Sequence, residues 1–127
     1  MAQLPLNTFK TKTAILSTSS TATVYTAPIG VTSIILMAQV ANLTTGTQAV
    51  TFVHHRNRPV LADAQGNGYQ PPNTDSYLVK EFGIPANDAG SPLGGKMIIE
   101  SLDSIRAYAS TENGLQLVLS VLETANS

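Results

Sequence analysis

The chain contains no cysteine and no tryptophan, and only 12% of its 127 residues are charged. The absence of cysteine excludes disulfides, thiolate metal sites and thiol nucleophiles. A net charge of −1 provides no overall field that would attract nucleic acid or an anionic membrane surface. No apolar run approaches the length of a membrane span, and the first residues do not have the pattern of a signal peptide. We therefore expect neither nucleic acid nor a membrane as a partner.

Threonine, serine, valine and isoleucine are abundant, a composition typical of β-structure. Short segments of alternating or β-branched residues recur between turn signals, and no segment has the pattern of a helix. We therefore predict an all-β fold, an antiparallel β-sandwich with a jelly-roll-like arrangement of about seven or eight strands. The predicted strands are residues 9–15, 23–27, 31–42, 48–55, 77–85, 96–100, 104–110 and 115–123.

The chain is long enough for one domain with a single core. We expect residues 1–20 to form an N-terminal arm or an edge strand. Residues 21–127 are expected to form one sandwich domain, with a long loop at 56–76.

Two pairs of consecutive strands are predicted to form hairpins. A Thr- and Gly-rich connection joins residues 31–42 to 48–55, which favours pairing of neighbours. The sequence Asn113-Gly114 lies between residues 104–110 and 115–123, and Asn-Gly is a favoured pair in tight hairpin turns.

The loop at 56–76 contains two glycines and two adjacent prolines, so we expect no regular ladder there. Its length exceeds what a hairpin needs, and such loops tend to be functional. It also contains apolar side chains that a purely flexible linker would not favour. We predict a contact arm toward other subunits, with Arg56, Arg58, Val60, Leu61 and Tyr69 as the candidate contact residues.

Both histidines of the chain, His54 and His55, lie in the motif "HHRNRP" at residues 54–59. Zinc requires at least three ligands that converge on one point. Adjacent residues of a strand point to opposite faces, and no spacing requires Asp63 or Asp75 to complete a ligand set. We expect no metal within one chain, although a three-fold axis that gathers three copies of one histidine is left open.

Catalytic motifs are not evident. No "GxSxG" sequence is present, and "GNG" and "LGGK" lack the strand–loop–helix setting of a phosphate-binding loop. Paired carboxylates of a glycosidase are conceivable, but the acids fall mostly at turns and strand ends. These acids are Glu81, Asp88, Glu100, Asp103 and Glu112. We predict that the protein is not an enzyme and has no cofactor.

Two segments of the chain resemble a family of small all-β virion proteins of tailed bacteriophages. The first is "VYTAPIGVTSIILMAQVANLTTGTQAVTFV", and the second is "YLVKEFGIPANDAGSPLGGKMIIESLDSIRAYASTENGLQLVLSVLE". The order and spacing of the two segments are more specific than either segment alone. Together the segments cover well over half of the chain. The chain departs from the family pattern at residues 101–103, where "SLD" replaces a glycine-containing turn, and in its longer middle loop and N-terminal arm.

The resemblance implies a structural subunit of a phage particle with no catalytic residues. The expected role is a capsid decoration or cement protein, or a neck- or tail-associated protein. Its expected partners are other copies of itself, with a trimer as the first expectation, and other virion structural proteins. It would reside in the host cytoplasm before assembly and in the virion afterwards.

Two other functions are considered. The first is a receptor- or glycan-binding module at a tail or fibre tip. The second is a jelly-roll enzyme of the cupin type, which is disfavoured because the histidine ligands of such a site are missing.

Overall fold

The computed structural model describes residues 7–56, 61–62, 64–69, 74–93 and 95–125. Regular structure within these ranges consists of strands, with no helix and hence none that could cross a membrane. The strands are β1 (Asn7–Ile15), β2 (Thr23–Thr26), β3 (Val31–Asn42), β4 (Gln48–Arg56), β5 (Leu61–Ala62), β6 (Gly68–Tyr69), β7 (Thr74–Ile84), β8 (Ala89–Gly90), β9 (Met97–Ile99), β10 (Ser104–Ala109) and β11 (Leu115–Ala125).

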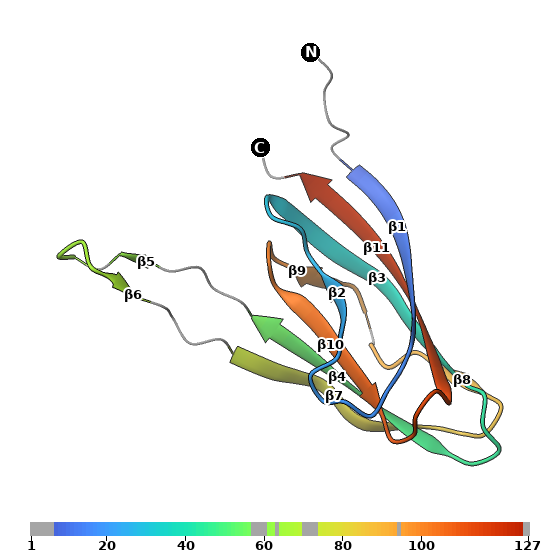
Figure 1. Ribbon diagram of the computed structural model, residues 1–127. Helices are drawn as coiled ribbons and strands as arrows, with labels where there is room; N and C mark the ends of the chain where they lie inside the picture. The colour runs from blue at the N-terminus through green and yellow to red at the C-terminus, as the bar shows by residue number, and fades with distance from the viewer. Residues whose placement is uncertain (1–6, 57–60, 63, 70–73, 94, 126–127) are drawn as a thin grey trace.

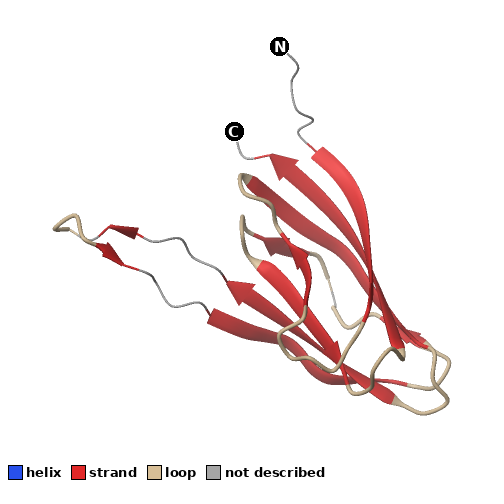
Figure 2. Cartoon of the chain, viewed as in Figure 1, coloured by secondary structure: helices blue, strands red, loops and turns tan. Residues whose placement is uncertain are grey.

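Nine of these strands form two antiparallel sheets that pack face to face (Figures 1 and 2). Sheet A has the order β1-β11-β3-β8, with β9 also paired to β3, and sheet B has the order β2-β10-β4-β7. Because β8 and β9 pair with different parts of β3, they occupy one edge position as an interrupted strand. The predicted antiparallel β-sandwich is confirmed, with four strand positions in each sheet.

The chain alternates between the two sheets at most connections, which is the jelly-roll arrangement. It passes from β1 in sheet A to β2 in sheet B, then to β3 and β4, and it alternates again from β7 to β11. The two hairpins predicted between residues 31–42 and 48–55 and between 104–110 and 115–123 are therefore wrong. In both cases the consecutive strands lie in opposite sheets.

Asn42 explains the first of these crossings. Its side-chain amide donates to the carbonyl oxygens of Gly46 and Ile84, each at 2.9 Å, and its side-chain oxygen accepts from the Thr44 backbone N–H at 2.9 Å. Asn42 is buried, so these bonds satisfy polar groups that water cannot reach. The connection after β3 is thereby bound to Ile84 of β7 in the opposite sheet, which favours the crossing over a hairpin with β3.

The middle of the chain departs from a second prediction, because part of it is a regular ladder. Leu61 pairs with Tyr69 and Ala62 with Gly68, and Gly66 adopts the positive φ of 83° within the intervening turn. The β4–β7 pair ends at Arg56 opposite Thr74, and the β5–β6 ladder lies beyond that end, away from the sandwich (Figure 1). We call the β5–β6 ladder the arm.

The core lies between the inner faces of the two sheets. In β11 one apolar face is buried, since Leu115, Leu117, Leu119 and Val121 are at most 1% exposed. Phe52 of β4 is fully buried among them in the same core cluster. Buried residues alternate with more exposed ones along β11, because consecutive side chains of a strand point to opposite faces.

The alternation in β11 predicts unequal effects of two neighbouring substitutions. Leu117→Ala should lower the free energy of unfolding by about 2–5 kcal/mol, because it leaves a cavity in a packed core. Val118→Ala, on the outer face, should lower it by less than about 1 kcal/mol. Denaturant unfolding of both variants measures the difference. Similar losses in the two variants would contradict the inward assignment of Leu117.

Candidate functional site

The outer face of sheet A carries no charge at the strand positions that point outward. Its side chains are Asn7, Phe9, Thr11, Thr13 and Ile15 in β1, Gln116, Val118, Ser120, Leu122 and Thr124 in β11, Thr32, Ile34, Met37, Gln39 and Ala41 in β3, and Ile98 in β9. We call this surface the uncharged face. Depletion of charge is a property of interface cores more than of solvent-exposed surfaces.

Four apolar side chains cross the uncharged face in one continuous row. Phe9 lies opposite Leu122, Leu122 lies opposite Ile34, and Ile34 lies opposite Ile98. Phe9 is 73% exposed and Ile98 is 61% exposed, while the two between them are half-buried. A contiguous exposed apolar strip is more informative than scattered apolar residues, because it marks surface that another molecule can cover.

The outer face of sheet B has a different character, because charged and aromatic side chains cover it. His55 Nδ1 contacts Asp75 Oδ1 at 2.5 Å, and Arg106 Nη1 lies 3.6 Å from the other oxygen of the same carboxylate. Tyr77 is 58% exposed, and a hydrogen bond with Tyr108 raises its pKa. This face therefore offers polar and aromatic groups where the uncharged face offers apolar ones.

The histidine motif is divided between the two faces of β4. His54 points inward, with Nε2 3.5 Å from Oδ2 of the buried Asp103, whereas His55 points outward to Asp75. Within the ranges that the structure describes, no three histidine, aspartate or glutamate side chains are placed to hold a metal ion. Each histidine thus lies beside its own carboxylate.

Among the five candidate contact residues, only Arg56 has a described side chain. Its Nη2 lies 3.5 Å from Glu100 Oε2, and both side chains are largely exposed, so this pair contributes little to stability. Arg58 and Val60, together with Asp63, lie outside the described residues. Leu61 and Tyr69 belong to the arm by their backbone pairing, and their side chains are likewise outside the description.

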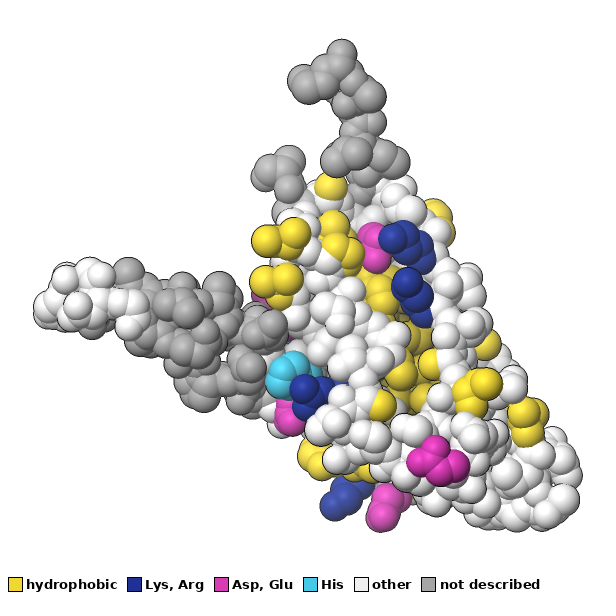
Figure 3. Space-filling model, in the orientation of Figure 1, with side chains coloured by type: hydrophobic (Ala, Val, Ile, Leu, Met, Phe, Trp, Pro, Cys, Tyr) yellow, Lys and Arg dark blue, Asp and Glu magenta, His cyan; other side chains and the backbone are white. Residues whose placement is uncertain are grey.

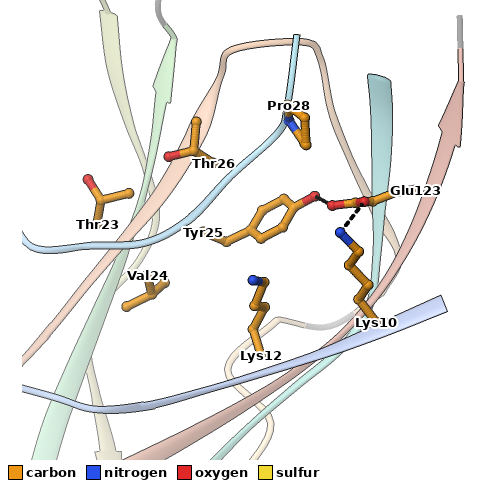
Figure 4. Close-up of a pocket in the computed structure, with 8 residues that line it drawn as sticks. All are labelled: Lys10, Lys12, Thr23, Val24, Tyr25, Thr26, Pro28 and Glu123. Atoms are coloured by element: carbon orange, nitrogen blue, oxygen red, sulfur yellow. Dashed lines mark hydrogen bonds and ion pairs between the residues drawn. The ribbon is translucent and has the colours of Figure 1, made fainter. Parts of the chain in front are cut away.

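A cleft opens where the edge strands β1 and β2 of the two sheets face each other. It encloses about 310 Å³ and is lined by Lys10, Lys12, Thr23, Val24, Tyr25, Thr26, Pro28 and Glu123 (Figure 4). In the space-filling view, basic and acidic side chains gather beside the hollow (Figure 3). No sequence motif indicates this site, because its residues come from β1, β2 and the turn after it, and β11, which are distant parts of the chain.

A polar network closes the inner end of the cleft. The Tyr25 hydroxyl donates to Glu123 Oε2 at 2.6 Å, and Ser33 Oγ lies 2.6 Å from the same hydroxyl. Lys10 Nζ lies 3.0 Å from Glu123 Oε1. Tyr25, Ser33 and Glu123 are all buried, so the network satisfies polar groups within the protein and joins β1, β2, β3 and β11.

The network fixes the protonation of its two acidic groups. Desolvation opposes the charge of Glu123, but the hydrogen bonds from Tyr25 and Lys10 and the nearby lysine charges outweigh it, so the pKa of Glu123 is lowered. Desolvation and the bond to Glu123 raise the pKa of Tyr25 far above its usual value. Near neutral pH the carboxylate is a poor proton acceptor and the phenol a poor donor, which suits a structural role better than acid–base catalysis.

The lowered pKa of Glu123 predicts a loss of stability in acid. The unfolded carboxyl titrates near its ordinary value of 4.5, so the contribution of Glu123 is present above that pH and is lost as the pH falls through the lower folded pKa. Denaturant unfolding from pH 6 downward should therefore show a steeper decline in the native protein than in Glu123→Gln. The exposed Glu100→Gln is the matched control and should retain the native decline. An unchanged slope in Glu123→Gln would show that the network does not hold the charge.

Comparisons with known proteins do not identify a relative of this chain. No family model, no curated protein and no solved structure matches the chain. The evidence for function is therefore the distribution of apolar, aromatic and charged side chains over the surfaces described above.

Proposed function

We propose that the protein is a structural subunit of a tailed-phage particle that acts through surface contacts. Its setting would be the capsid, as a decoration or cement protein, or the neck or tail, with the chain in the host cytoplasm before assembly. The single observation that carries a contact role is the uncharged face with its apolar row. The resemblance of residues 24–53 and 77–123 to small virion proteins supports the phage setting.

Covering the uncharged face with another protein would remove exposed apolar surface from water. Phe9 and Ile98 expose most of their surface, and burying apolar area contributes roughly 25 cal/mol per Å². No charged side chain on the uncharged face would have to be desolvated when a neighbour covers it. Coverage by another protein therefore gains apolar burial at small electrostatic cost.

Other copies of the chain are the first proposed partner. A trimer with closed symmetry is the proposed state, because jelly rolls often pack around a three-fold axis. Other virion proteins are the second. The arm supports the same role, because it extends beyond the sandwich and reaches surfaces that the two sheets do not (Figure 1).

Charge placed on the apolar row should prevent assembly without unfolding the subunit. The double variant Phe9→Lys/Ile98→Lys introduces two ammonium groups that a contact would have to desolvate. Light scattering at micromolar concentration should show trimers of the native chain and mostly monomers of this variant. Both substituted side chains are exposed, so its unfolding free energy should change by less than about 1 kcal/mol.

Ile29→Lys is the matched control, because Ile29 is 79% exposed but lies in the turn between β2 and β3, outside the uncharged face. It should assemble like the native chain. A native chain that is monomeric both alone and in mixtures with purified particles would contradict the proposed contact role. If the native chain does assemble, its copy number per particle distinguishes a decoration protein from a neck or tail protein.

A receptor- or glycan-binding module at a tail or fibre tip is the second candidate, and the outer face of sheet B favours it. Tyr77 and Tyr108 lie there beside Arg106 and Asp75, and Lys80 Nζ lies 5.7 Å from the Tyr77 ring centre. Tyrosine offers an apolar ring with a polar hydroxyl, and planar charged groups orient polar ligands.

A glycan array distinguishes the two candidates. Specific binding by the native chain that Tyr77→Ala abolishes and Ile98→Ala leaves intact would favour the glycan-binding module. Absence of binding to any arrayed glycan counts against this second candidate and leaves the contact role in place.

A further inference from the structure

The cleft between β1 and β2 contains more positive than negative charge. Lys10 and Lys12 both line it, and Glu123 is the one acid among its lining residues. Lys10 is paired with Glu123 at 3.0 Å. No ion pair joins Lys12 to any acid in the portion of the chain that the structure describes. The site therefore has one ammonium group in excess of its carboxylate.

The position of this ammonium group is suited to a ligand. Figure 4 shows the Lys12 side chain directed into the cleft, below Tyr25. Thr23 and Thr26 of β2 also line the cleft, but their side chains point away from Lys12 (Figure 4). The two oxygens of Glu123 contact Tyr25 and Lys10, and the Lys12 charge acts on Glu123 only from a greater distance.

We propose that the cleft binds a single carboxylate group, with the Lys12 ammonium as its charge partner. One carboxylate would make the site electrically neutral. A doubly charged phosphate would leave an excess negative charge beside Glu123, which like-charge repulsion disfavours. The group that is recognised is the carboxylate, whether a small free acid or the acidic side chain of another chain supplies it.

The test is a titration of the purified protein with sodium acetate, followed by amide NMR shifts and compared with sodium chloride at equal ionic strength. Saturable shifts are expected at Lys12 and at residues 23–26. Lys12→Gln should weaken the dissociation constant about tenfold or more, because a charge-assisted hydrogen bond is lost. Lys12→Arg should retain binding. Lys96→Gln removes the same charge from an exposed site outside the cleft and should bind like the native protein.

One further ligand separates the possible sources of the carboxylate. A tripeptide with one central glutamate and blocked ends tests an acidic side chain, while acetate tests a free acid. Saturable binding of either at the cleft supports the proposal and identifies the source. Binding of neither, shifts equal to those with chloride, undiminished binding by Lys12→Gln, or tighter binding of inorganic phosphate than of acetate would each overturn it. Lys12 is exposed and outside the Tyr25–Glu123 bond, so the variant remains folded, which its unfolding curve verifies.

Discussion

The strands of this protein present alternate residues to opposite sides, and the core accepts only one of those sides. Two sheets whose inner faces carry Leu117, Leu119 and Ile105 have to pack against each other to remove that surface from water. The outer faces, the strand edges and the connecting loops remain available for contacts with other molecules. The contrast between the uncharged face of sheet A and the charged, aromatic face of sheet B is therefore where differences in partners can arise.

The open side of the sandwich imposes a second constraint. Where β1 and β2 diverge, the buried Tyr25–Glu123 bond takes the place of apolar packing. It also draws Lys10 toward the interior from edge strand β1. An inward-pointing charge on an edge strand opposes the pairing of a further strand. Contact through the outer face of sheet A is thus more consistent with this structure than extension of the sheet beyond β1.

The sequence was sufficient to predict most of the strands, because a period of two is visible in segments such as Leu115–Val121. It was not sufficient to assign strands to sheets. Alternation specifies which residues are buried but not against what, so Asn113-Gly114 was misread as a hairpin turn when it connects opposite sheets. The cleft was missed for a related reason, since Tyr25 and Glu123 are 98 residues apart and neither belongs to a recognisable motif.

The pairing of β1 with β11 joins the two ends of the described chain, with Asn7 opposite Thr124. During synthesis β11 emerges last, yet it occupies the position between β1 and β3. Until then β1 has no neighbour in its sheet, and one edge of β3 lacks the strand that pairs with it along its full length. Loop closure across nearly the whole chain must precede completion of sheet A, and such non-local topologies fold slowly. Before β11 has left the ribosome, β1 and β3 therefore present unpaired edges, which are the part of a sheet prone to aggregation.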